Sequence, residues 1–172
     1  MRKQIQSDLR RTILVLAPFK ISAKQTGDAI YGQIILTSIT LILLCMGVHH
    51  EALRLASSRL IASHIPPRLN VSLAVLIALA AHFVEVVIFS IGWHVLLQDG
   101  VGSLSSAATD METLIYFSLV TYTSLGYGDV IPIGPIRLLA GIESLVGLVL
   151  IAWTASFTYL EMRRYWFTTE EL

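Results

Sequence analysis

Three long apolar stretches constrain this chain more than any other feature, because a soluble domain of this size cannot bury them all. They cover residues 29–48, 71–97 and 136–160. Each approaches or exceeds the roughly 20 apolar residues that a helix needs to cross a ~30 Å hydrocarbon core. Charged residues make up 14% of the 172 residues, against about a quarter in a soluble domain. We therefore expect an all-α membrane protein with three transmembrane helices.

A fourth apolar segment, residues 110–122, is too short to span a membrane. About 12 helical residues rise only ~18 Å, which enters a bilayer without crossing it. Thr109 and Glu112 have the spacing of a capping box, which predicts that the helix begins here. We expect a re-entrant helix that ends at residues 123–129.

Residues 123–129 read Thr-Ser-Leu-Gly-Tyr-Gly-Asp, and the alternating glycines indicate an ion site made of backbone. Gly126 and Gly128 reach left-handed angles easily, so successive carbonyls can point in one direction. Four such strands around an axis would replace the hydration shell of a potassium ion. One chain supplies one strand, so the sequence predicts a homotetramer in membrane lipid. The formal net charge of zero gives no indication of nucleic-acid binding.

The stretch from Val71 to about Leu160 resembles the pore domain of potassium channels, with an outer helix, a pore helix, a filter and an inner helix in that order. It is most similar to small bacterial members that carry one extra N-terminal membrane helix. The resemblance implies a passive potassium-selective channel of the cell membrane, with potassium as permeant ligand, no cofactor and no enzymatic activity. The resemblance implies four parts in chain order: a basic segment 1–28, an extra transmembrane helix with its connecting loop 29–70, a pore domain 71–164 and a short tail 165–172. Within the pore domain it implies an outer helix 71–97, a pore helix 110–122, a filter 123–129 and an inner helix 136–160.

The resemblance also assigns roles within the filter. The ion-binding residues are Thr123, Ser124, Leu125, Gly126, Tyr127 and Gly128, and the potassium sites lie at Ser124, Leu125, Gly126 and Tyr127. Ser124 replaces the usual threonine and keeps its hydroxyl, whereas Leu125 replaces the commoner valine. These two departures leave a weakly selective monovalent cation channel open as an alternative. A non-conducting regulatory or assembly subunit is a second one.

Support for the filter is expected from the pore helix. By the resemblance, Tyr127 points away from the pore axis into a ring of aromatic side chains on the pore helix, the aromatic cuff. Family members frequently have tryptophans there, whereas this chain has Tyr116 and Phe117. Asp129 would anchor the outer end of the filter. Its usual tryptophan donor is missing, and the hydroxyl of Tyr116 is the expected substitute.

The inner helix carries a candidate gating residue. Family members place an arginine near its outer end and a glycine ten residues later, as Arg137 and Gly147 are placed here. Helices commonly bend at glycine, and glycine also permits close helix packing. Gly147 is therefore either a hinge or a packing residue, and Gly141 has the same two possibilities.

Two carboxylates lie inside the apolar spans. Burying one at mid-bilayer costs at least ~2.5 kcal/mol, so Glu85 and Glu143 should face protein or water. His82 and Glu85 are three residues apart and share a helix face. They are either structural braces, with Ser118 or Thr121 as possible partners, or gating groups, with His82 titrating near neutral pH.

A zinc site is a weaker possibility. His49, His50 and Glu51 are potential ligands, and His82 would complete a set. Adjacent helical residues project about 100° apart, which follows from 3.6 residues per turn, and the chain has no His-Glu-x-x-His pattern. An intramembrane metalloenzyme is therefore disfavoured.

The orientation in the membrane receives conflicting signals. A filter loop that enters from outside requires the N-terminus outside as well, yet the basic residues of segment 1–28 favour the cytoplasm. The arginines in the connecting loop and after the inner helix do fit an inside position. We therefore orient the chain by the filter loop and not by the basic residues, which places the N-terminus outside. Residues 12–19 could then lie along the membrane surface or dip into it.

Overall fold

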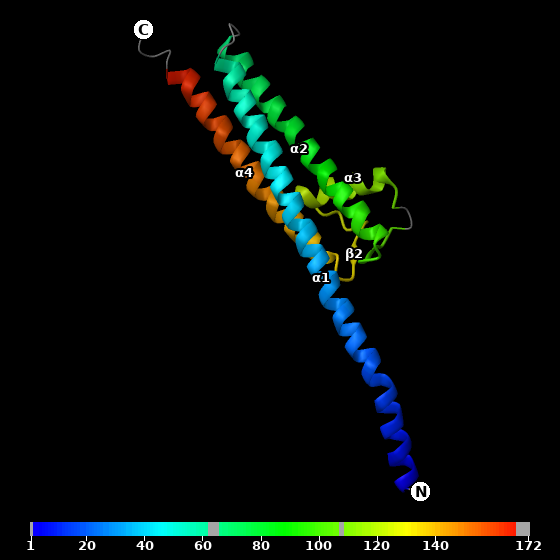
Figure 1. The fold of residues 1–172 in the computed structure, drawn as a ribbon. Helices are drawn as coiled ribbons and strands as arrows, with labels where there is room; N and C mark the ends of the chain where they lie inside the picture. The colour runs from blue at the N-terminus through cyan, green and yellow to red at the C-terminus, as the bar shows by residue number, and fades with distance from the viewer. Residues whose placement is uncertain (1, 62–65, 107–108, 168–172) are drawn as a thin grey trace.

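The computed structural model describes residues 2–61, 66–106 and 109–167, including the side chains of 27–58, 66, 69–106 and 109–163. Within these residues the elements follow in the order α1 (Arg2–Ile61), α2 (Pro67–Gln98), β1 (Ser103–Leu104), α3 (Met111–Tyr122), β2 (Pro132–Ile133) and α4 (Arg137–Phe167). Figure 1 shows α1, α2 and α4 side by side, with the much shorter α3 beside α2.

Three helical segments of the described chain are long and apolar enough to cross a membrane: Gly27–Ser58, Leu69–Gln98 and Arg137–Arg163. Only 22–28% of the residues in their most apolar windows are buried within the chain. Most of their side chains therefore face lipid or other copies of the protein. The predicted all-α membrane fold with a short fourth helix is confirmed.

Helix α1 is longer than the sequence predicted. Its buried side chains recur every three or four residues, the spacing that lines one helix face, and they are Ile34, Ser38, Leu41, Cys45, His49, Leu53 and Ala56. The predicted loop after residue 48 is wrong, because this buried face continues and the helix runs to Ile61.

The N-terminal part of α1 extends beyond the bundle, at the end where β2 lies (Figure 1). Residues 12–19 continue the same helix, so they form no separate segment that dips into the membrane. The C-terminal end of α4 lies at the opposite end of the bundle. This arrangement agrees with the topology derived from pore geometry.

The linker between α2 and α3 is tied to the segment after the filter. β1 pairs antiparallel with β2, matching Ser103 with Ile133 and Leu104 with Pro132. The backbone N–H of Ser105 donates to the carbonyl of Ile131 at 2.9 Å. A Cβ at Gly102 would lie 2.7 Å from the Ile133 carbonyl oxygen, so only glycine permits this approach.

Helix α3 begins at Met111, one residue later than predicted. Asp110, and not Thr109, is the N-cap, and its side chain accepts from the Thr113 N–H at 2.9 Å. This hydrogen bond lowers the pKa of Asp110 below its ordinary value. The predicted capping box of Thr109 with Glu112 is wrong, because Asp110 occupies the cap position and its side chain serves the first-turn amide.

Candidate functional site

The backbone after α3 alternates in handedness. Ser124, Gly126 and Gly128 have φ of 57°, 54° and 82°, while the intervening Leu125 and Tyr127 have no positive φ. Such alternation allows successive carbonyls to turn toward one side of the strand. Ser124 holds this conformation without being glycine, and a left-handed residue with a side chain is strained by about 1–2 kcal/mol. The predicted filter segment thus has the backbone geometry that a carbonyl-lined ion site requires.

The inner end of the filter is held by the end of α3. The N–H groups of Leu125 and Gly126 both donate to the carbonyl of Val120, at 2.9 and 3.1 Å. Ser144 of α4 donates its hydroxyl to the carbonyl of Thr121 at 2.9 Å. These bonds fix where the strand leaves the helix and link that point to α4.

The outer end is held as the sequence suggested. The Tyr116 hydroxyl donates to Oδ2 of Asp129 at 2.8 Å. This hydrogen bond is the main reason why the pKa of Asp129 lies below its ordinary value. Asp129 is consequently a carboxylate at neutral pH and a strong acceptor for the tyrosine.

The aromatic cuff does not form within one chain. Tyr127 and Leu125 are 68% and 57% exposed. Phe117 packs edge-to-face on Trp93, with ring centroids 4.8 Å apart. Phe117 also borders a cavity of about 390 Å³ behind the filter strand, together with Gly126 and Gly128. Any cover for Tyr127 and Leu125 has to come from outside the side chains that the structure describes.

Gly147 lies where the pore helix ends against α4. A Cβ on Gly147 would meet the carbonyl oxygen of Tyr122 at 2.0 Å, far closer than atoms can approach. Gly141, in contrast, has nothing within 4 Å of a Cβ among the described residues. The structure therefore assigns Gly147 a packing role, and bending at Gly147 stays a prediction.

Glu143 joins three helices from a fully buried position. Its Oε2 accepts from Nε1 of Trp93 on α2 at 2.7 Å. Its Oε1 accepts from the hydroxyl of Ser118 on α3. Of the two possible partners of Glu143 named from sequence, Ser118 contacts it. Thr121 contacts α4 at another residue, because its backbone carbonyl accepts from the Ser144 hydroxyl. Trp93 was not predicted as a partner of Glu143, because the periodicity of apolar residues does not show which acceptor an indole N–H contacts.

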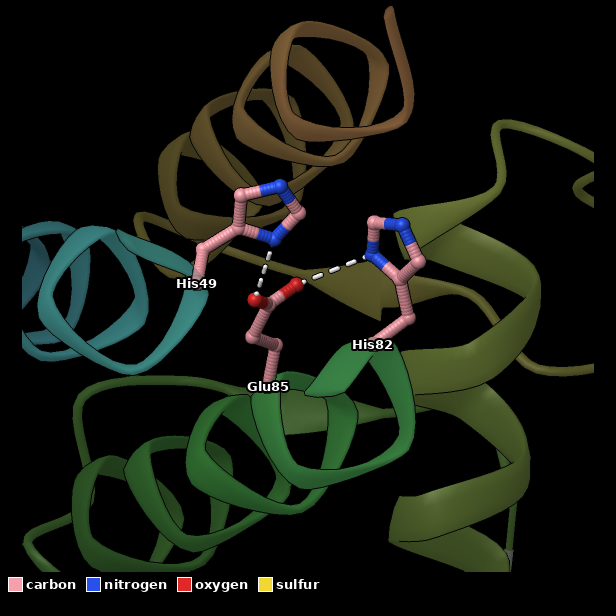
Figure 2. Close-up of side chains that lie close together, drawn as sticks. All are labelled: His49, His82 and Glu85. Carbon is pink, nitrogen blue, oxygen red and sulfur yellow. Dashed lines mark hydrogen bonds and ion pairs between the residues drawn. The ribbon is translucent and has the colours of Figure 1, made fainter. Parts of the chain in front are cut away.

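Glu85 is the centre of a second buried cluster. Figure 2 shows its carboxylate between the rings of His49 from α1 and His82 from α2. The Nδ1 atoms lie 2.9 Å (His49) and 3.0 Å (His82) from its oxygens, and the Tyr122 hydroxyl also donates to it. The predicted proximity of His82 and Glu85 is confirmed.

The potential zinc ligands named from sequence do not gather as a set. His50 is exposed, with its ring beside Trp153, and Glu51 pairs with Arg54 at 2.7 Å. Of these residues His49 lies beside His82, and among the described residues Glu85 is the third group that could ligate a metal ion with them. Sequence analysis could have included Glu85 only if it had shown that α1 packs on α2 with residue 49 level with residue 85.

The fold and filter agree with a family comparison. Residues 76–162, about half of the chain, match the family model described as "Ion channel". The chain belongs to this ion channel family, whose pore is formed by two membrane helices and which includes potassium channel pores. Comparison with curated proteins and with solved structures gives no match.

Proposed function

We propose that the protein is a potassium-selective channel of the cell membrane that conducts passively as a homotetramer. The observation that carries the proposal is the alternating backbone of Ser124, Gly126 and Gly128. In a fourfold ring, carbonyls turned to one side replace the water around a dehydrated potassium ion. Potassium would occupy rings formed by Ser124, Leu125, Gly126 and Tyr127.

The exposed side chains of the filter support assembly of several copies. Tyr127 is 68% exposed beside a cavity that begins behind the same strand. A large aromatic side chain at a membrane pore needs a packing partner. A neighbouring copy would supply it, because each chain presents both an exposed filter and an open cavity.

Purified protein in liposomes tests the proposed selectivity. We expect a potassium gradient to drive flux, with little flux when sodium replaces potassium. Similar fluxes of both ions would favour the weakly selective cation channel. No flux of either ion, across the pH values and lipids tested, would favour the non-conducting subunit. The ion channel family is generally non-enzymatic. Modulation by pH through His82 stays a prediction that no contact in the structure tests.

The outer anchor gives a second prediction. Tyr116→Phe removes the hydroxyl that Asp129 accepts from, so the outer end of the filter loses its brace. We expect the ratio of potassium to sodium flux to fall by a few-fold while the protein still folds. Tyr159→Phe is the matched control, since Tyr159 is 63% exposed on α4, away from the filter. An unchanged flux ratio in Tyr116→Phe would show that the brace is dispensable.

A further inference from the structure

The cluster around Glu85 brings the nitrogen atoms of two histidine rings into contact with a carboxylate and two hydroxyl groups. On one side, Nδ1 of His49 and Nδ1 of His82 both face the Glu85 carboxylate, at 2.9 and 3.0 Å. On the other side, Nε2 of both rings faces the single hydroxyl of Thr154. Those distances are 3.0 Å for His82 and 3.3 Å for His49.

Without a metal ion, neutral rings can satisfy this cluster in one arrangement of protons. Nδ1–H of His49 donates to Glu85, and Nδ1 of His82 accepts from the Tyr122 hydroxyl, 2.9 Å away. Nε2–H of His82 then donates to the Thr154 oxygen, and the Thr154 hydroxyl donates to Nε2 of His49. The same ring nitrogens and carboxylate, with His49 and Glu85 fully buried, also form a potential set of metal ligands.

A metal ion offers the cluster a second arrangement of protons. When Nδ1 of each ring binds metal, both rings carry the proton on Nε2, and the two lone pairs of the Thr154 oxygen accept from both. Metal-bound histidines in proteins usually donate their second ring N–H to an oxygen in this way. We propose that His49, His82 and Glu85 bind a first-row divalent transition metal ion, with the oxygen of Tyr122 as the fourth ligand.

The geometry fits a tetrahedral ion after the side chains adjust. The three ligand atoms lie within 4.8 Å of one another. Metal–ligand bonds of ~2.0–2.1 Å separate tetrahedral ligands by about 3.3 Å. The two His–Glu contacts therefore open by a few tenths of an ångström, and a ligand pair near the 4.8 Å limit closes by about 1.5 Å. Imidazole nitrogens favour zinc, cobalt, nickel or copper over magnesium and calcium, which prefer oxygen.

The charges also fit an apolar surrounding. Two neutral imidazoles, one carboxylate and a Tyr122 phenolate balance a divalent cation, and a bound cation promotes loss of the phenol proton. Cys45 lies near this cluster, but its sulfur is 3.9 Å from the backbone oxygen of Glu85 and outside the ligand set. A cavity of about 330 Å³, bordered by His82, Tyr122 and Thr154, reaches the cluster and gives an entry path.

Such an ion would act directly on the base of the filter. Tyr122 is the last residue of α3 and precedes Ser124 by two residues. The metal would fasten α1 and α2 to this point, so it should change ion flux. That consequence rests on the proposed channel function, whereas metal binding itself does not.

Cobalt binding to the full-length protein tests the site. The protein is purified in lipid nanodiscs through a histidine-free tag and stripped with a chelator. We expect Co²⁺ titration to produce the intense visible absorption of tetrahedral cobalt with one ion per chain, and Zn²⁺ to bleach it. His49→Ala and Glu85→Gln should lower the affinity at least tenfold. Thr154→Val, which keeps all ligands, should lower it about tenfold through lost orientation.

Matched controls separate this site from other histidines. His50→Ala and His94→Ala should bind cobalt as wild type does, since His50 is exposed beside the cluster and His94 lies near the outer end of α2. Equal losses in these controls would overturn the proposal. Wild-type protein provides a readout that needs no variant: Zn²⁺ should raise its unfolding temperature and chelator should reverse the rise. Wild-type protein that binds neither ion would overturn the metal site and leave the cluster as a hydrogen-bonded brace between the helices.

Discussion

Gly147→Ala should abolish most potassium flux and destabilise the folded protein. The added Cβ would lie 2.0 Å from the carbonyl oxygen and 2.8 Å from the carbonyl carbon of Tyr122. Both are backbone atoms, so no side-chain rotation can relieve the clash, and α4 must move away from the end of α3. Overpacking of this kind costs about 1–3 kcal/mol or more. Thermal unfolding of the purified protein and liposome flux measure the two effects.

Gly141→Ala on the same helix is the control. It gains the same ~1 kcal/mol of helix propensity but meets nothing within 4 Å in the described chain. The pair also separates packing from bending at Gly147. Lost flux with unchanged or increased stability would indicate a hinge, because alanine stiffens a helix without a clash. Native flux and native stability in Gly147→Ala would contradict both roles.

Local sequence patterns were enough to predict the membrane helices and the segment whose backbone alternates in handedness. Apolar length determines the three spans, and the Gly-Tyr-Gly-Asp run marks the site independently of the rest of the fold. The end of α1 was missed for a physical reason. His49, Leu53 and Ala56 are buried against other helices, but in a membrane helix the lipid-facing side is equally apolar, so hydropathy cannot show which face is packed.

Pairings across helices were the part that sequence could not supply. His82 and Glu85 share one helix, so their contact follows from spacing alone. His49 reaches Glu85 only because α1 and α2 pack at one particular register, and no periodicity within α1 encodes that register. The role of Gly147 was open for the same reason, since its close neighbour is a carbonyl on α3.

The buried contacts of Glu143 give the second large effect. Glu143 is the one side chain of α4 that accepts from both Trp93 on α2 and Ser118 on α3 among the described contacts. Removing it strands the indole N–H, whereas Ser118 can still donate to the Val86 carbonyl at 3.0 Å. An unsatisfied buried donor costs about 1–3 kcal/mol, and the vacated volume adds a cavity cost.

Glu143→Ala should therefore lower the free energy of unfolding by about 3 kcal/mol or more and reduce potassium flux, because the pore helix loses its link to α4. Glu143→Gln should be much milder. Its carbonyl can still accept from Trp93, while its amide donates to the Ser118 hydroxyl, which in turn donates to Val86. Trp93→Phe combined with Glu143→Ala should cost less than the sum of the two single changes, as expected for partners in one contact. Additive costs in that double-mutant cycle would show that Trp93 and Glu143 are not coupled. A Glu143→Gln variant as unstable as Glu143→Ala would show that an amide cannot replace the carboxyl group in these contacts.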